Sequence, residues 1–353
     1  MEIENTAVDI MTKKQRGSLR VFRLMIPLLI GIAVTGILFY QEFYSEAWGQ
    51  FRFTWVEGVC IILAFHFIVM RDLSMMWRFR LMCGQDKLSW RQAFYTNLLC
   101  EFTSAITPSA VGGSGLIVLF LKAEGVPAGK GTAVMMSTLF LDELCLVVVC
   151  PLLFLIFPEE KLFGTSVGIT GLHITFAIIY LLIIAWTIVL YAALFKRPQV
   201  IGGIIYRLFR MPLLNRWTSR AEEFTKNLQL SSRQMADWSL LFWMKAGIAT
   251  LAAWSSRFLV VCALFLPFIP LGEQPLVFAR QFILWIVMTI SPTPGGSGVS
   301  EYLFSTCYND LVGTAGVVFL ITCCWRIITF YLYLFAGISL LPGWIRNKFH
   351  SID

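Results

Sequence analysis

Apolar runs separated by short polar stretches fill most of the chain from residue 21 onward. A transmembrane helix needs about 20 mainly apolar residues. We therefore expect full spans at about residues 21–40, 55–77, 131–157, 172–195, 239–265 and 311–341. This pattern predicts an all-α polytopic membrane protein with about six full spans.

Two further apolar regions, residues 91–122 and 274–308, are each interrupted by residues that end helices. The first contains TPSAVGGSG from residue 107, and the second contains SPTPGGSGVSE from residue 291. Neither half of either region is long enough to cross a membrane alone. Non-helical backbone survives in lipid only where protein or a wet cavity satisfies its polar groups. We therefore expect two re-entrant broken hairpins.

The two interruptions share the sequence Gly-Gly-Ser-Gly, which begins at Gly112 and at Gly295. Their separation is 295 − 112 = 183 residues. At this offset, residues 55–157 and 239–341 form two copies of span, broken hairpin and span, with one unpaired span between them. An odd separating span inverts the second copy. The sequence thus predicts the inverted repeat of many transporters, with the hairpin tips meeting near the midplane from opposite sides.

Charged residues are 14% of the chain and the formal net charge is +7. If both hairpins are re-entrant, the basic segments all fall on the cytoplasmic side, as the positive-inside rule requires. This predicts cytoplasmic tails at 1–20 and 346–353 around a transmembrane domain at 21–345. We expect the membrane to be the cytoplasmic (inner) membrane of a bacterium. We interpret residues 196–236 as a cytoplasmic amphipathic linker on the membrane surface, with a solvated linker as the alternative. No nucleic-acid partner is expected.

The nine cysteines and three histidines do not have the spacing of a metal site. The chain also has no motif that pairs a nucleophile with a base, and no phosphate-binding loop of the Walker type. We therefore expect a protein that is not an enzyme, with no catalytic residues, no metal and no cofactor.

The two helix breaks carry the chemistry of a lipid head-group site. A helix that restarts after Gly115 would have Ser114 near its N-cap, and one that restarts after Gly298 would have Ser297 there. Helix N-termini attract phosphate, and the glycines leave room for a head group. Alternatively, the glycines only let the two tips pack closely. The candidate head-group residues are Thr107, Pro108, Gly112, Gly113, Ser114, Pro294, Gly295, Gly296, Ser297, Glu301 and Arg280.

Charges within the spans predict an intramembrane network, since such charges are costly and usually pair or mark a pathway. Its candidate members are Glu101, Asp142, Glu143, Arg257 and Arg326. The repeat offset relates two of these residues, because 143 + 183 = 326. Glu143 and Arg326 are interpreted either as a structural salt bridge or as residues that contact the substrate, and both interpretations stay open.

Other charged residues call for separate interpretations. Glu301 would repel a phosphate unless it is paired with an arginine, protonated or facing a cationic head group. Arg257 and Arg280 are alternatively structural partners of the acids. Arg71 and Asp72 are expected at the membrane interface.

Three motifs carry a resemblance to a known family. They are the Thr-Pro-x-x-x-Gly-Gly region, the acidic segment Leu141-Asp142-Glu143 and the later PTPGGSGVSE. From about residue 20 to 345 the chain resembles the lysylphosphatidylglycerol synthase transmembrane or flippase-like family. The segment Ser109-Ala110-Val111 departs from it, since the family often has a basic or bulkier residue there.

The resemblance implies a membrane region associated with moving lipid across the bilayer. The best-understood members also carry a soluble aminoacyl-transferase domain, which we do not expect in this chain, so we do not carry the synthase activity over. We therefore expect a flippase that passes an aminoacylated or anionic phospholipid head group through a cavity between the hairpins. The alternatives are a transporter of a polyprenyl-phosphate carrier and a non-transporting membrane partner of a lipid-modifying transferase. Homo-oligomerisation is left open.

Overall fold

The computed structural model of the protein describes residues 54–84, 87–107, 111–164, 169–196, 238–291, 293, 295–312 and 315–349, together with scattered positions between 197 and 237. The expected N-terminal tail, the first expected span and most of the basic linker lie outside these residues. The predictions for those segments therefore stay predictions.

Every described element is a helix, as the apolar pattern predicts. The longest are α2 (Trp55–Cys83), α5 (Ala128–Ile156), α7 (Ile169–Tyr191), α10 (Leu240–Phe265) and α14 (Leu332–Phe349). The shorter helices are α3 (Trp90–Ile106), α4 (Val111–Ala123), α6 (Glu159–Phe163), α11 (Gln274–Met288), α12 (Val299–Val312) and α13 (Ala315–Arg326). A 3-10 turn at Leu271–Glu273 precedes α11, and π-helical turns extend α7 over Ala192–Lys196 and join α13 to α14 over Ile327–Tyr331.

Within the described part of the chain, five helical stretches are long and apolar enough to cross a membrane. They are Trp55–Cys83, Ala128–Ile156, Gly171–Lys196, Leu240–Phe265 and Gly316–Lys348. The predicted all-α multi-pass class is confirmed for these residues.

Two expected boundaries were wrong. α2 continues past residue 77 to Cys83, because Arg78 is buried and paired inside the protein and does not mark a membrane surface. The last expected span does not begin at residue 311, since Leu311 belongs to the end of α12. A new helix starts at Ala315, and its apolar stretch runs through the π-helical turn into α14.

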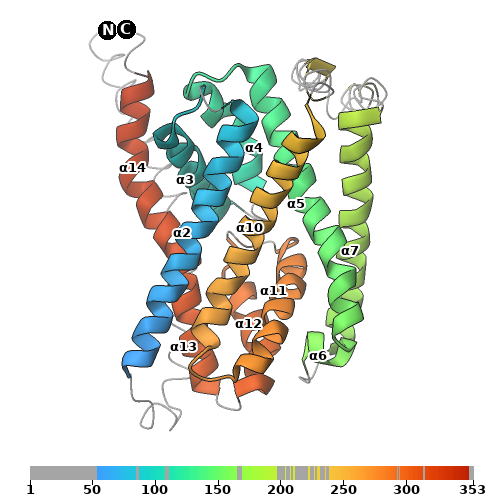
Figure 1. The fold of residues 1–353 in the computed structure, drawn as a ribbon, viewed down its shortest axis with the longest axis vertical. Coiled ribbons are helices and arrows are strands. Elements are labelled where there is room, and N and C mark those ends of the chain that lie inside the picture. The colour runs from blue at the N-terminus through green and yellow to red at the C-terminus, as the bar shows by residue number, and fades with distance from the viewer. Residues whose placement is uncertain are drawn as a thin grey trace, which may run out of the picture.

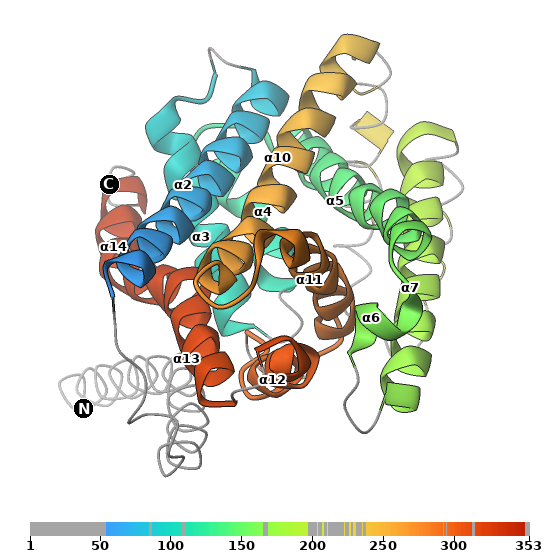
Figure 2. The ribbon, with the colours of Figure 1, turned by 60° about the horizontal axis from the view of Figure 1, so that its bottom comes forward.

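The helices form a bundle around α2 and α10, which lie side by side along its length (Figures 1 and 2). The pair α3 and α4 lies in the upper half of Figure 1, and the pair α11 and α12 lies in the lower half. Each pair therefore occupies about half of the bundle's height, beside helices that run its full length.

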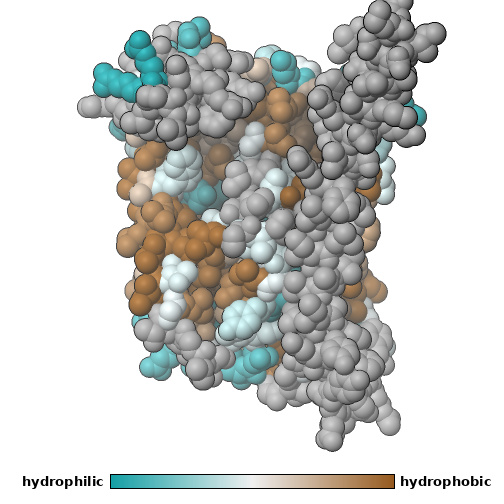
Figure 3. Space-filling model, turned by 180° about the vertical axis from the view of Figure 1, so that it is seen from behind, coloured by the Kyte–Doolittle hydropathy of each residue, from teal (hydrophilic) through white to brown (hydrophobic). Residues whose placement is uncertain are grey.

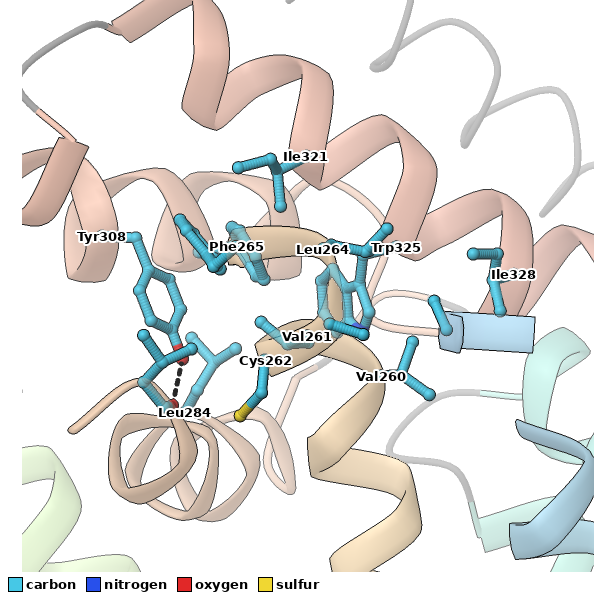
Figure 4. Packing of buried hydrophobic residues seen from close by; sticks show 14 of the residues in the cluster. Val260, Val261, Cys262, Leu264, Phe265, Leu284, Tyr308, Ile321, Trp325 and Ile328 are labelled. Atoms are coloured by element: carbon cyan, nitrogen blue, oxygen red, sulfur yellow. Dashed lines mark hydrogen bonds between the residues drawn. The ribbon is translucent and has the colours of Figure 1, made fainter. Parts of the chain in front are cut away.

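The lower part of the bundle is held by a cluster of large buried side chains (Figure 4). Phe265 of α10 stacks near Phe304 and Tyr308 of α12, and Trp325 of α13 packs on Phe304. The Tyr308 hydroxyl donates a hydrogen bond to the Val277 carbonyl of α11, 3.0 Å away. Close packing of this kind and interhelical hydrogen bonds hold helices together in lipid, so this cluster fixes α11 and α12 against α10 and α13.

Candidate functional site

The two helix breaks touch each other. The Gly295 N–H donates a hydrogen bond to the Thr107 carbonyl oxygen, 3.2 Å away. Thr107 ends α3 in an extended conformation with φ −114° and ψ 147°, as expected of a residue before proline. The predicted meeting of the two breaks is therefore confirmed as a direct contact between their backbones.

Only glycine fits at position 295, where the two breaks touch. Its φ is +58°, a left-handed conformation that costs other L-residues energy. A Cβ there would also overlap the Phe330 ring and would lie 2.8 Å from the Ala105 carbonyl oxygen. The close-packing interpretation of the glycines therefore applies to Gly295.

In the first break, α4 already begins at Val111, so its Gly-Gly-Ser-Gly sequence lies inside the helix. The prediction that the helix restarts after Gly115, with Ser114 near its N-cap, is wrong. A Cβ on Gly113 would overlap Ser104 Oγ and the Cys100 carbonyl oxygen of α3. Gly113 thus serves the close approach of α3 and α4.

The second break matches its prediction more closely, since α12 begins at Val299, directly after Gly298. Its glycines form the turn itself, and φ is +71° at Gly296 and +86° at Gly298. The side chain that holds the new helix N-terminus is Glu301. Its Oε2 accepts hydrogen bonds from the Gly298 N–H at 2.6 Å and from Ser300 Oγ at 2.8 Å.

Arg326 ties α13 to the second break. Its Nε lies 2.8 Å from Glu301 Oε1, and the two side chains are only 4% and 3% exposed. The same guanidinium donates hydrogen bonds to the Gly295 carbonyl at 3.2 Å and to Ser297 Oγ at 3.1 Å. The salt bridge between Glu143 and Arg326 suggested by the repeat offset is therefore wrong. Arg326 ends α13 beside the second break, where it contacts Glu301 and not Glu143. Of the three alternatives given for Glu301, the structure shows the one in which Glu301 is paired with an arginine.

A second charge cluster joins α2, α3 and α10. Arg71 of α2 lies 2.7 Å from Asp72 and 3.3 Å from Glu101 of α3, and Arg257 of α10 lies 3.2 Å from the same Glu101. The Tyr333 hydroxyl donates to Asp72 at 2.6 Å. Arg71, which was expected at the membrane interface together with Asp72, is fully buried in the bundle, because Glu101 of α3 and Tyr333 of α14 lie against its guanidinium. Arg257 therefore contacts an acid, as the alternative interpretation of this residue as a structural partner requires.

A third cluster lies between α2, α5 and α10. Asp142 accepts hydrogen bonds from Arg78 at 2.6 Å and from Trp254 Nε1 at 3.0 Å. Arg78 also donates to Thr250 Oγ1 at 2.9 Å. The neighbouring Glu143 differs, because its buried Oε2 has no hydrogen-bond partner among the described residues. Sequence reasoning missed Arg78, whose position near the end of an apolar run resembles that of an interfacial anchor.

The remaining candidates lie elsewhere or outside the described residues. Arg280 contacts Asp310 at 2.6 Å and donates to the Lys161 carbonyl at 2.7 Å, in a cluster between α6, α11 and α12. Its role as a head-group ligand stays a prediction. Pro108 and Pro294 are outside the described residues, as is the side-chain environment of Gly112.

Exposure separates the clusters. The side chains of Asp72, Glu101, Asp142 and Arg257 retain 24%, 19%, 21% and 18% of their exposure, whereas the Arg326–Glu301 pair is sealed. Figure 3 shows white and teal residues within the brown belt of the coloured surface. The accessible charges can contact a polar ligand, whereas the sealed pair holds the break in shape. No group of metal-ligating side chains occurs in the described residues.

Membrane-length helices, two touching helix breaks and paired interior charges define a multi-pass membrane protein with a polar interior. The family model described as the lysylphosphatidylglycerol synthase TM region matches residues 17–337. The chain therefore belongs to this family. It is also similar to a "UPF0104 membrane protein" of Archaeoglobus fulgidus, with 25% identity over 334 residues, covering 92% of this chain and 98% of that protein. No solved structure gives a significant match.

Proposed function

We propose that the protein is a transporter that moves an amphiphilic phospholipid, aminoacylated or anionic, across the membrane. The observation that carries this proposal is the contact of two helix breaks within an apolar bundle that also holds partly exposed ion pairs. Non-helical backbone and interior charges are costly in lipid and mark substrate sites in transporters. The lipid tails stay in the bilayer while the head group passes through the interior.

The helix pairs α3–α4 and α11–α12 act in this proposal as the two re-entrant hairpins of an inverted repeat. Their places in opposite halves of the bundle support this assignment (Figure 1). The contact between Thr107 and Gly295 supports it as well. A break that enters from each side gives each membrane face its own access to the interior.

Arg257 and Glu101 are the proposed head-group contacts. The Arg257 guanidinium lies 3.2 Å from Glu101 and stacks over the Trp285 ring, 4.6 Å from its centroid. A guanidinium binds phosphate through two parallel hydrogen bonds. Glu101 and Asp142 would receive the ammonium group of an aminoacylated lipid. Glu101 keeps Arg71 as a second partner, so Arg257 can exchange one anion for another without leaving a bare carboxylate.

The charge at the two ends of the bundle supports a cytoplasmic upper end in Figure 1. The positive-inside rule places basic residues on the cytoplasmic side. The helix ends that lie at the top of Figure 1 belong to α2, α3, α4, α5, α7, α10 and α14, and near those ends the sequence has Arg80, Arg91, Lys122, Lys130, Lys196, Arg346 and Lys348, with the acid Glu124 paired to Lys348. Near the helix ends at the bottom it has Glu57, Glu159, Glu160, Lys161 and Glu273. With the expected first span crossing the membrane before α2, both chain termini would be cytoplasmic in this proposal.

Purified protein in liposomes tests the function. Fluorescent phosphatidylglycerol, lysylphosphatidylglycerol and a polyprenyl phosphate are added in separate arms, with a membrane-impermeant quencher reporting lipid in the outer leaflet. We expect a gain of accessible phospholipid over protein-free liposomes, and a loss of that gain in the Glu301→Ala, Arg326→Ala double variant. Glu222→Gln is the control, because its exposed pair with Lys226 contributes little.

The same assay separates the alternatives. Movement of the polyprenyl phosphate alone would replace the phospholipid with a lipid carrier as the substrate. No movement of any lipid, together with a stoichiometric transferase that copurifies with the chain, would contradict transport and favour a membrane partner of a lipid-modifying enzyme.

A further inference from the structure

Glu143 differs from the other acids in the interior of the bundle. The described interior arginines each contact at least one carboxylate. The pairs are Arg71 with Asp72 and Glu101, Arg257 with Glu101, Arg78 with Asp142, Arg280 with Asp310, and Arg326 with Glu301. Glu143 contributes to none of these pairs, and its Oε2 is buried without a hydrogen-bond partner in the described part of the chain.

Among the described residues, the helices packed against α5 supply no cation that any contact places on this carboxylate. They are α2, α4, α7, α10 and α11. Arg71 and Arg78 of α2, Arg257 of α10 and Arg280 of α11 are held by other acids. Arg80, in the last turn of α2, donates to the Leu88 carbonyl and lies over the Trp90 ring. The Tyr180 hydroxyl of α7 donates a hydrogen bond to the Val147 carbonyl. His173 Nδ1 of the same helix lies 3.6 Å from Glu159 Oε1. Lys122 in the last turn of α4 and Lys245 near the start of α10 lie toward the helix ends.

An ionised Glu143 would therefore be an excess negative charge in the bundle, on a side chain that is partly exposed but has one oxygen buried. Burial of an unpaired carboxylate is costly, and such a group commonly becomes neutral instead. The carboxylate of Asp142 beside it adds like-charge repulsion. Binding of one proton removes both costs. A proton can bind the buried Oε2, which the ammonium of a head group could not reach.

We propose that Glu143 is a proton-binding site in the membrane interior, and that its protonation accompanies lipid movement. The coupling rests on the function proposed above, whereas the proton site itself does not. The carboxylate takes up one proton and becomes a neutral carboxylic acid, so the interior charge changes by one. A pH difference across the membrane would then bias the direction of transport.

Infrared absorption of the full chain in liposomes tests the proton site directly. Spectra are recorded across pH for the wild type, for Glu143→Gln and for Glu160→Gln, which removes an exposed acid of α6. We expect a pH-dependent band of a protonated carboxyl group in the wild type and in Glu160→Gln, and its loss in Glu143→Gln. The same band in all three proteins, or no band in any, would overturn the proposal.

Thermal unfolding gives a second measurement on the same proteins. Raising the pH should ionise Glu143 and lower the midpoint of the wild type more than that of Glu143→Gln, because glutamine stays neutral. Equal pH dependence of the two midpoints would count against the site.

The lipid assay then separates the two proposals. We expect the rate of lipid movement to depend on pH in the wild type and to lose that dependence in Glu143→Gln. An unchanged dependence would overturn the coupling. A Glu143 band without lipid movement in any protein would contradict the transport function and leave the proton site standing.

Discussion

The two helix breaks carry the same Gly-Gly-Ser-Gly sequence but build different structures from it. In the first break the sequence lies inside α4, and Gly113 packs against α3. In the second break the glycines form a left-handed turn before α12, and a sealed ion pair holds that turn. The first break is therefore a joint between two closely packed helices, and the second is a turn clamped from α13.

Two sequence differences account for this. Pro294 directly precedes the glycines of the second break, whereas Pro108 stands four residues before Gly112, which leaves room for α4 to begin earlier. The second break also has Glu301 to bind the free N–H of Gly298. Its equivalent in the first copy is residue 301 − 183 = 118, which is Val118, and valine cannot cap a helix. The repeated Gly-Gly-Ser-Gly motif thus predicts the position of a helix interruption better than its backbone conformation.

The strongest test of this difference removes Arg326. The variant Arg326→Met leaves Glu301 buried and unpaired, which should lower the free energy of unfolding by about 3–5 kcal/mol. Denaturant unfolding in detergent micelles measures the change. Combining it with Glu301→Gln should restore much of the loss, because no buried charge then remains. If Arg326→Met alone is as stable as the wild type, the ion pair does not hold the second break.

The first break should respond instead to volume. Gly113→Ala should cost roughly 1–3 kcal/mol, since the new methyl group overlaps the α3 backbone at Cys100. Gly115 is the matched control, because the space around it is open. There alanine should stabilise the helix by roughly 0.5–1 kcal/mol. Equal effects of the two variants on the unfolding midpoint would refute the packing role of Gly113.

The smallest expected effect is that of removing the Ser297 hydroxyl. Ser297→Ala removes the acceptor of a hydrogen bond from Arg326, at a cost of about 1–2 kcal/mol. Because Arg326 keeps Glu301 and the Gly295 carbonyl, the variant should fold and show only a lower unfolding midpoint. If Ser297→Ala lowers the stability as much as Arg326→Met does, Ser297 and not the ion pair holds the second break in shape.

Sequence reasoning reached the helical class, both breaks and their contact, because helix-breaking residues in apolar runs are a local signal. The partners of the interior charges were harder to predict. Arg78 and Asp142 are 64 residues apart, and Tyr333 and Asp72 are 261 apart, so no local pattern joins them. Hydropathy also cannot show which face of a helix is buried, which is why Arg71 was expected at the interface.

The offset between the copies failed for Arg326 for a related reason. Equivalent positions in two copies share a depth in the bundle, but a side chain pairs with its nearest acid. For Arg326 that acid is Glu301, which lies across the break from α13.

The rate at which phosphatidylglycerol becomes accessible in liposomes containing Arg257→Gln tests the central claim most directly. This variant should fold, because Glu101 keeps its contact with Arg71. Loss of a charged hydrogen bond to the phosphate should slow movement roughly tenfold or more, whereas Glu222→Gln should match the wild type. Equal rates for Arg257→Gln and the wild type would contradict a head-group path along Arg257 and Glu101.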